Sequence, residues 1–280
     1  MTTTLAPGVY KDTPFKDYLS WPAVSKHDLD LISRSPAHFQ AAKRHPQETT
    51  PAMQFGTAAH TWILEPDKAP SEVAVMPKVD RRTKAGKEEY EDWKLIHGNK
   101  TLVTQDDARH ISHMAAAVNN HAMAGPLLKD RKMTEASMCW QNDLTETLCR
   151  CRPDLISGDI VIDLKTTFDA SKQAFQNTIA KYRYNVQAAY YLDGCKKLGV
   201  VSDDATFLFV VVERKPPYGV AVYALPNDDL ERGRFQYEKD LGRYAHCEKT
   251  GHWFGYSERI DYANLPFYAR KEIDALTGNE

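Results

Sequence analysis

The segment that most constrains this chain is RPDLISGDIVIDLK, which covers residues 152–165. Two short apolar runs flank Gly158-Asp159, and a two-residue turn of this kind between apolar runs is typical of a β-hairpin. With these two residues as the turn, the register places Asp154 opposite Asp163. Directly opposed residues of a hairpin have Cβ atoms about 4.5–5.5 Å apart on one face of the sheet. The segment therefore predicts two carboxylates that lie side by side.

Two carboxylates this close repel each other unless a cation lies between them. Mg²⁺ is bound in proteins by one or two carboxylates together with phosphate and water. Lys165 lies two residues after Asp163, so its side chain points to the same face of the strand. A lysine there can position a water molecule, or stabilise charge on phosphorus, while the metal lowers the pKa of the water. Asp154, Asp163 and Lys165 therefore predict metal-dependent phosphodiester cleavage, and a structural ion triad is the alternative.

Acid-x-lysine triplets also occur elsewhere in the chain, so the triplet alone predicts nothing. DWK at residues 92–94 lies in a highly charged stretch that we expect to be a solvated helix. ERK at residues 213–215 is preceded by Asp204, with the same nine-residue separation between acids as in the hairpin. Residues 205–212 (ATFLFVVV) contain no turn, however, and nine residues of strand span about 30 Å. Those two acids cannot share a metal ion.

The remaining sequence patterns predict helices packed on a mixed sheet, an α/β (α+β) fold in a single domain without a clean linker. We expect a mainly helical part over residues 1–130, a sheet-and-helix core over 131–250 and an irregular tail over 251–280. Helices are expected from Ser25 to a break near Ser35-Pro36, from about Met53 to Leu64, over 169–197 and over about 228–248. Strands are expected within 135–166 and over 205–212 and 220–225.

Composition limits the function classes. The apolar fraction of 42% supports a sizeable core, and the net charge of −2 means that a nucleic-acid partner needs a local basic surface. Five cysteines, an odd number, predict reduced thiols and a cytoplasmic protein. Cys149 and Cys151 have neither zinc spacing nor a matching second pair, so buried thiols are favoured over a metal cluster. No apolar run is long enough to cross a bilayer, so we expect no membrane association.

The segment RPDLISGDIVIDLKTT, followed by a helix that contains YNVQAAYYLDG, resembles the RecB-like branch of the PD-(D/E)xK nuclease superfamily. Within that branch the chain is most similar to RecE-type exonucleases (exodeoxyribonuclease eight). The likeness covers most of the chain, because SRSPAHF, FGTAAHTWILEP, DRRTKAGKEEYEDW and EASMCW precede the hairpin in the family's order. The resemblance implies the nuclease core of this superfamily, a central mixed β-sheet flanked by helices.

The resemblance also implies roles for individual residues around the metal. It makes Asp154 and Asp163 the metal-binding carboxylates and Lys165 the catalytic lysine. The backbone carbonyl of Leu164 is implied as a further ligand. His60, in FGTAAH, is implied as a ligand or neighbour of the metal, with a buried structural histidine as the alternative.

Further residues are implied to contact DNA. Gln187 and Tyr191 match the Q-x-x-x-Y motif of the branch and share one helical face, with core packing as the alternative. Glu135 lies where many relatives place an acid near a second metal or the DNA end. Arg152 and Tyr184 are candidates for phosphate contact. A carboxylate pair is the alternative for Arg152, and solvated surface is the alternative for Tyr184.

The activity implied by the resemblance is a Mg²⁺-dependent exodeoxyribonuclease, with Mn²⁺ as an alternative ion. Its substrate is linear double-stranded DNA, cut from 5′ to 3′ to leave 3′ single strands for recombination by strand annealing. The family favours ring-shaped homo-oligomers and a single-strand annealing protein as partner. The alternatives are a structure-specific or single-strand nuclease of the same superfamily and a DNA-end-binding module without catalysis.

Overall fold

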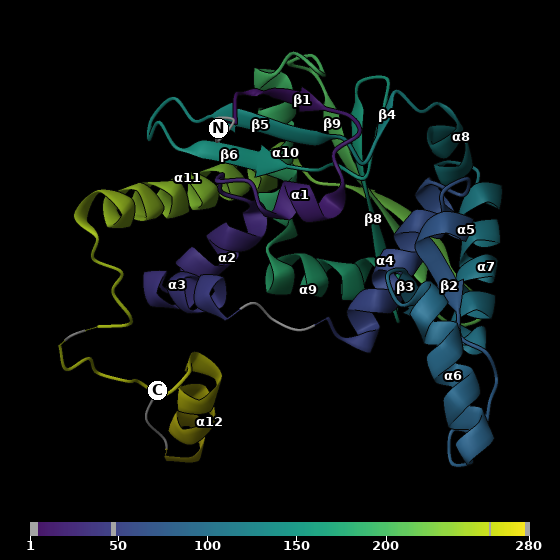
Figure 1. Ribbon diagram of the computed structural model, residues 1–280. Helices are drawn as coiled ribbons and strands as arrows, with labels where there is room; N and C mark the ends of the chain where they lie inside the picture. Colours follow the sequence, from purple (N-terminus) through teal and green to yellow (C-terminus); the bar gives the residue numbers. More distant parts are fainter. Residues whose placement is uncertain (1–4, 46–48, 258, 278–280) are drawn as a thin grey trace.

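The computed structural model describes residues 5–45, 49–257 and 259–277, and a five-stranded sheet lies at its centre (Figure 1). The strand order is β10-β9-β8-β7-β4, with β8 and β9 parallel and the other neighbours antiparallel. This is the mixed sheet that the sequence predicted. Its strands are β4 (Met133–Thr134), β7 (Leu155–Ser157), β8 (Ile160–Thr167), β9 (Thr206–Glu213) and β10 (Val220–Ala224).

The β7–β8 hairpin has the predicted register, with Leu155 opposite Ile162. Gly158 in its turn has φ +52°, a left-handed conformation that glycine adopts without strain from a Cβ. Strand β7 begins only at Leu155, so Asp154 lies directly before the ladder and not within it. The hairpin prediction is confirmed up to this last pair.

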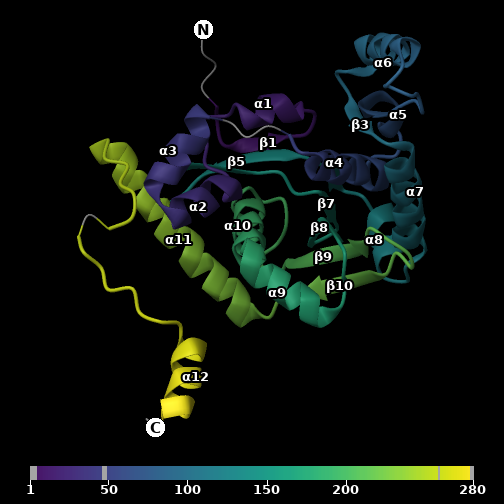
Figure 2. The same cartoon turned by 90° about the horizontal axis from the view of Figure 1, so that it is seen from below.

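Strands β8 and β9 are buried on both faces, which explains their nearly continuous apolar sequence. Alternate residues contribute to two apolar clusters, one against α10 (Tyr184–Lys197) and one against α4 (Pro51–Leu64) and α7 (Gln105–Asn120). Figure 2 shows α9 (Lys172–Tyr182), α10 and α11 (Asn227–Thr250) on one side of the strands and α4 and α7 on the other. Asp163 and Lys165 alternate onto the α10 face, together with Val161.

The N-terminal segment packs onto the core and does not form a separate unit. Its first strand pairs with β5 in a second sheet of order β1-β5-β6, and α2 contacts α11. The helix predicted from Ser25 begins there with a capping box formed by Ser25 and Asp28, and it ends before Pro36 as predicted. The elements are β1 (Gly8–Tyr10), α1 (Phe15–Leu19), α2 (Lys26–Arg34), α3 (Pro36–Arg44), β5 (Ser137–Gln141) and β6 (Leu148–Cys151).

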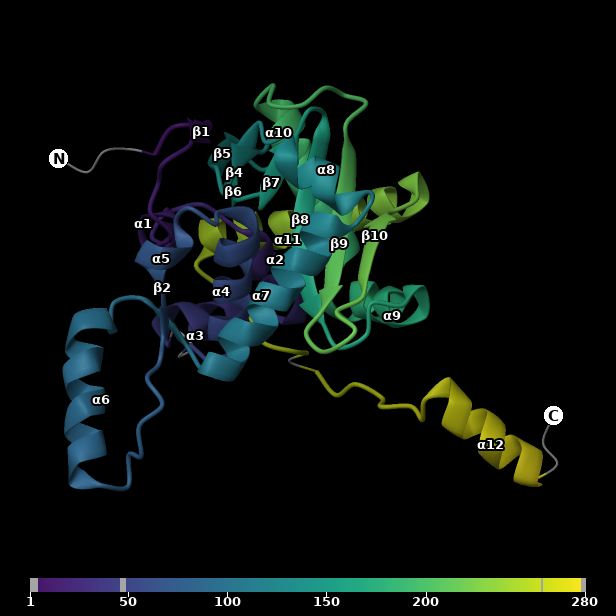
Figure 3. The same ribbon diagram turned by 90° about the vertical axis from the view of Figure 1, so that its right-hand side faces the viewer.

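A helical arm projects from the body on the far side of α4 and α7 (Figure 3). It consists of α6 (Lys84–His97) and a small parallel sheet of β2 (Val73–Val75) and β3 (Thr101–Val103). The short helix α5 (Ala69–Glu72) contacts β2 in this region, whereas α8 (Ala124–Lys129) packs on α7 and β7. Most of α6 is exposed, which agrees with the solvated helix expected around residues 92–94.

The long helix predicted over residues 169–197 is wrong as a single element. Helix α9 begins after Ser171, whose hydroxyl accepts the N–H of Ala174, and it ends at Arg183, which has φ +53°. The Arg183 guanidinium is held by Asp240 at 2.5 Å and by Asp30 at 3.1 Å. These long-range ion pairs stabilise the left-handed backbone conformation of Arg183, which the neighbouring sequence does not predict.

The tail predicted as irregular over residues 251–280 contains a helix, α12 (Phe267–Thr277), so that prediction is wrong for this part. The segment holds several strong helix formers, such as Ala269, Glu272 and Leu276. None of its residues is buried, and Figures 1–3 show the helix apart from the body. Among the described residues, no helix combines the length and the apolarity that crossing a lipid bilayer requires.

All five cysteines are buried free thiols. Among the described residues they form no cluster with the geometry of a metal site. The prediction of ordinary buried thiols is confirmed.

Candidate active site

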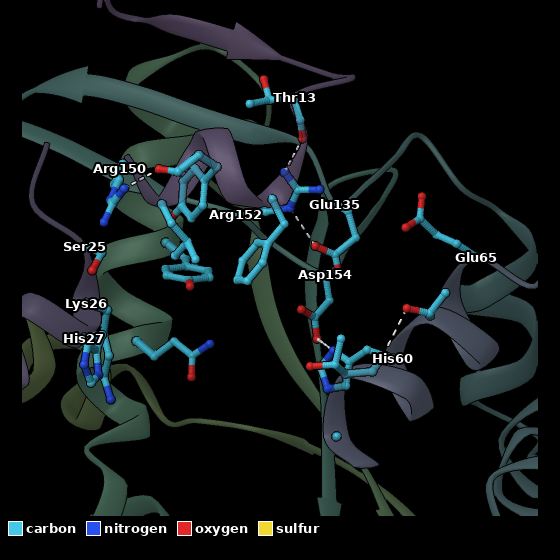
Figure 4. Close-up of a pocket in the computed structure, with 18 of the residues that line it drawn as sticks. Thr13, Ser25, Lys26, His27, His60, Glu65, Glu135, Arg150, Arg152 and Asp154 are labelled. Atoms are coloured by element: carbon cyan, nitrogen blue, oxygen red, sulfur yellow. Dashed lines mark hydrogen bonds and ion pairs between the residues drawn. The ribbon is translucent and has the colours of Figure 1, made fainter. Parts of the chain in front are cut away.

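A pocket of about 850 Å³ lies where α1, α2, α4 and α10 surround the start of the hairpin (Figure 4). Asp163 and Leu164, both buried, do not line it. Eight of the ten residues singled out in the sequence line this pocket: His60, Glu135, Arg152, Asp154, Lys165, Tyr184, Gln187 and Tyr191. The fold therefore brings eight of the predicted residues to one pocket, although they come from segments far apart in the chain.

Three side chains form a donor group at the wall of the pocket. One ligand atom each from His60, Glu135 and Asp154 lie within 4.8 Å of one another. Nδ1 of His60 is 3.4 Å from Oδ2 of Asp154, and the backbone N–H of Glu135 donates to the carbonyl of Asp154 at 3.1 Å. Figure 4 shows Glu135, Asp154 and His60 one below another. Helix α4 thus brings His60, and the turn before β5 brings Glu135, to Asp154 at the start of the hairpin.

Asp163 lies behind this group and is only 3% exposed. Its Oδ1 accepts a hydrogen bond from Nε2 of Gln187. Nζ of Lys165 is 2.6 Å from its Oδ2, but the angle is not that of a hydrogen bond, so Oδ2 has no hydrogen-bond partner. The charge of this buried carboxylate is thus balanced by the Lys165 ammonium.

In this arrangement the two aspartates have different nearest partners. Asp154 is closest to His60 and Glu135, whereas Asp163 contacts Lys165 and Gln187. Binding of one ion by both aspartates stays a prediction.

The pKa values of the three acids shift in different directions. Burial would raise the pKa of Asp154, but the charges of His60 and Lys165 lower it. Burial, followed by the charge of Asp154, raises the pKa of Glu135 to about 7. Burial and the charge of Asp154 also raise the pKa of Asp163, against the opposing charge of Lys165. Burial would lower the pKa of His60, but Asp154 and the other acids outweigh it and raise that pKa to about 9. Positive charge is favoured at this position, as a divalent cation would supply it.

The backbone of Leu164 offers one more donor to the site. Its N–H donates to Oδ2 of Asp154 at 2.6 Å, so this edge of β8 faces the site. In a strand, the N–H and the C=O of one residue point to the same edge. Extending the hairpin register by two pairs places Pro153 opposite Leu164, and proline has no N–H to give to that carbonyl. The sequence thus leaves the Leu164 carbonyl available, and its role as a ligand stays a prediction.

These residues fit a divalent cation. Carboxylate and carbonyl oxygens suit Mg²⁺ and Mn²⁺, and an imidazole nitrogen is accepted by transition metals such as Mn²⁺. The grouping of His60, Glu135 and Asp154 offers such an ion three donors within 4.8 Å of one another.

Lys165 is held as a charged group beside the acids. Its Nζ lies 4.4 Å from the ring centroid of Tyr184 and donates to Oε1 of Gln187 at 3.1 Å. Burial alone would lower the pKa of Lys165, but Asp163 and its other neighbours raise it. Tyr184, expected either at phosphate or in solvent, therefore packs against the lysine.

Gln187 and Tyr191 lie on one face of α10, as the sequence predicted. Gln187 is 7% exposed and bridges Asp163 and Lys165, so its visible role is to position that pair. Tyr191 packs edge-on against Phe207, with ring centroids 6.3 Å apart, and lines the pocket. Contact of either residue with DNA stays a prediction.

Arg152 pairs with a carboxylate, which was the alternative reading. Its Nε donates to Glu135 at 2.8 Å, and its Nη1 donates to the carbonyl of Thr13 and the hydroxyl of Ser137 (Figure 4). Arg152 therefore fixes Glu135 in the donor group.

Sequence reasoning missed Lys26 in the pocket wall. Its Nζ contacts Asp30 at 2.7 Å and the carbonyl of Tyr182 at 2.6 Å, and it lies 5.9 Å from the ring of Tyr184. A lysine in the first turn of a helix has no sequence signal that separates it from ordinary surface lysines. Only the packing of α2 against the turn between α9 and α10 brings it to the site.

The family model that matches this chain is a PDDEXK-like domain of unknown function (DUF3799), over residues 25–266. The chain belongs to this family. The match covers the pocket walls from α2 onward and the whole hairpin, so the PDDEXK-like fold holds every residue of the donor group.

One solved structure shares the overall fold of this chain. A crystal structure of a "putative exonuclease" from Eubacterium rectale has a TM-score of 0.58 and 10% identity, covering 96% of this chain and 99% of that one. The structure of SSO0001 has a TM-score of 0.35 and 13% identity, covering 80% and 81%. Of these two structures, the first has a TM-score that indicates a shared fold, and its 10% identity supports a likeness of the fold alone. No curated protein matches the chain.

Proposed function

We propose that this PDDEXK-like protein is a Mg²⁺-dependent exodeoxyribonuclease that degrades linear double-stranded DNA from 5′ to 3′ and leaves 3′ single strands for recombination by annealing. The observation that carries the proposal is the buried acid–lysine set at the pocket. Asp154, Asp163 and Lys165 lie together with a histidine and a third acid, which a binding module alone does not need. The fold-level neighbour described as an exonuclease supports the same class.

Each side chain of the set has a defined part in this proposal. Asp154, Glu135 and His60 would hold the metal ion, with Asp163 and the Leu164 carbonyl as further donors. The ion, when bound, supplies Lewis acidity to a phosphate oxygen and lowers the pKa of its water.

Lys165 presents a fixed positive charge to the oxygens of the phosphate that is attacked. Gln187 and the ring of Tyr184 hold its ammonium in place before substrate binds. A preorganised charge of this kind is worth more in a water-poor site than in solution.

The size of the pocket supports an end-directed activity. A volume of about 850 Å³ lies within the range of about 300–1,000 Å³ typical of small-molecule sites. A pocket of this size offers room for the end of a single strand. We therefore propose that the protein needs a free DNA end.

The proposed assembly is a ring-shaped homo-oligomer that acts with a single-strand annealing protein. The support is electrostatic, because a net charge of −2 gives little overall attraction for DNA. Retention through many cleavages then requires enclosure or a focused basic groove.

Digestion of linear duplexes labelled at either end, with and without Mg²⁺ and beside a closed circle, tests the proposal. We expect release of the 5′ label first, only with Mg²⁺, and no attack on the circle. Rapid nicking of the circle would contradict the end requirement, and release of the 3′ label first would contradict the polarity. Degradation of single strands alone would indicate a single-strand nuclease, and binding without cleavage would indicate an end-binding module.

A further inference from the structure

Arg214, directly after β9, lies between two aromatic rings. Its guanidinium carbon is 3.9 Å from the ring centroid of Phe55 and 5.4 Å from that of Phe168. Phe55 is 5% exposed and belongs to α4, whereas Phe168 is 74% exposed. The arginine is therefore stacked on a buried ring and covered by a ring that faces solvent.

In the described part of the chain the guanidinium is bonded to no carboxylate, and Asp107 is the acid whose charge acts on it from further away. Its side chain makes no ion pair and no hydrogen bond there, and only the backbone N–H of Arg214 is used, by the carbonyl of Thr167. The adjacent carboxylate of Glu213 is bound instead by the backbone N–H groups of Ala170 and Gly219. Stacking leaves the edge of a guanidinium free, and this edge matches a phosphate in shape and charge.

Arg214 is connected to the active site through two rigid elements. In the β8–β9 register Lys165 pairs with Val211, so Arg214 follows three residues further, about 10 Å along the strand, and its side chain leaves on the α4 face of the sheet, opposite to that of Lys165. Phe55 precedes His60 by five residues, about 7.5 Å along α4. The distance suits a neighbouring part of the same bound strand.

Helix α4 adds positive potential on this side. The helix has 14 residues and no acidic residue in its first turn, and Phe55 lies in its second turn. The amino end of a helix carries partial positive charge and favours anions.

We propose that Arg214 binds a phosphate of the nucleic-acid backbone near the one at the active site, with Phe168 against the adjoining sugar or base. This inference rests on the proposed function, because it names a second contact for the same substrate. An exposed aromatic side chain beside an arginine is a combination that nucleic-acid-binding proteins use for strands.

Equilibrium binding of a short fluorescent DNA duplex, measured with a chelator present so that no strand is cut, tests the inference. We expect Arg214→Gln to weaken binding about tenfold and to reduce the salt dependence by about one phosphate contact. Arg214→Lys keeps the charge but not the stacking and should recover part of the affinity. Arg232→Gln is the control, because Arg232 is exposed on α11 and pairs with Asp229.

A second measurement locates the phosphate. Neutral methylphosphonates placed one at a time along the strand should weaken wild-type binding at one position next to the scissile phosphate. In Arg214→Gln that position should lose its effect while the others keep theirs.

The outcomes separate the two proposals. If the wild type binds DNA, two results would overturn the role of Arg214 alone. One is that Arg214→Gln keeps the affinity and the salt dependence of the wild type. The other is that Arg232→Gln loses as much affinity as Arg214→Gln. Absence of any DNA binding by the wild type would overturn this inference together with the proposed function. The melting temperature of each variant shows whether an affinity loss follows from unfolding.

Discussion

Two neighbouring strands of this sheet carry the same type of triplet with different results. In β8, Asp163 and Lys165 are buried against each other at 2.6 Å. At the end of β9, Glu213 is bound by backbone N–H groups and Lys215 is exposed, 3.4 Å from a ring nitrogen of His110. Asp163 pairs with Phe209 in the middle of the two parallel strands, whereas Glu213 is the last residue of β9. The long strand before Glu213 contains no turn, whereas the hairpin turn precedes Asp163. The difference shows what distinguishes a candidate site from a chance acid-x-lysine triplet. It is a tight turn before the triplet, which brings a second acid next to the first.

The largest expected effect comes from removing an acid of the hairpin. Asp154→Asn and Asp163→Asn should each lower cleavage by about a thousandfold, since a bound metal is worth several kcal/mol and each 1.4 kcal/mol is about tenfold in rate. Both variants should also lose most of the thermal shift that Mg²⁺ produces, because that shift reflects binding to the folded state. Their metal-free melting temperatures should stay level or rise, as one repelling charge is removed.

Glu213→Gln is the matched control on β9, and it should leave the Mg²⁺-induced shift unchanged. If Glu213→Gln lost as much of that shift as Asp163→Asn, the two strands would not differ in metal binding, and the comparison between them would fail.

Lys165→Ala should separate chemistry from metal binding. We expect cleavage to fall by about 10²–10³-fold, the usual result of removing one preorganised charge at a transition state. The Mg²⁺-induced thermal shift should be kept, because lysine is not a ligand. Single-turnover cleavage beside a melting curve measures both quantities. Cleavage at the wild-type rate would show that the lysine is structural.

Substitutions on α10 should have smaller effects. Gln187→Ala leaves an oxygen of Asp163 and the ammonium of Lys165 without a hydrogen-bond partner, so cleavage should fall by about 10–100-fold. Tyr191→Phe should lower cleavage less and leave the fold intact. Melting temperatures far below that of the wild type in both variants would show that this face of α10 belongs to the hydrophobic core. Full activity in both variants would show that it does not contribute to the active site.

The smallest effect concerns stability against pH without metal. The pKa of Glu135 in the folded protein is about 7 against an ordinary 4.5, and that of His60 is about 9 against 6.5. The folded state therefore holds more protons than the unfolded state between these limits, and stability should fall as pH rises from about 5 to 9. The pKa of Asp154 is lowered instead, so this residue changes the stability only at pH values below its ordinary pKa of 3.8, outside this range.

Thermal unfolding with a chelator measures this dependence. Glu135→Gln should flatten the lower half of the curve, and Mg²⁺ should reverse the slope, because ligands bind a metal in their deprotonated form. A metal-free melting temperature that rose with pH over this range would contradict the charge balance described for the site.

The sequence predicted the parts of the site that local rules determine. The hairpin register follows from its turn and the start of α2 follows from its capping box, because both depend on residues close in sequence. The left-handed break at Arg183 depends on Asp240, 57 residues away, and no local rule contains it. The pairing of Arg152 with Glu135 required the fold as well, because it joins the ends of two segments whose spacing is set by the second sheet.

The short turn at Gly158 has a consequence for how this chain can change in length. Surface loops usually accept insertions, and the loops around the α6 arm place no described residue in the pocket. The turn of the hairpin lies at the surface too, but a one-residue slip between β7 and β8 would send every later side chain to the opposite face. Asp163 and Lys165 would then point towards α4, away from Gln187. This exposed dipeptide should therefore tolerate changes of residue type far better than changes of length.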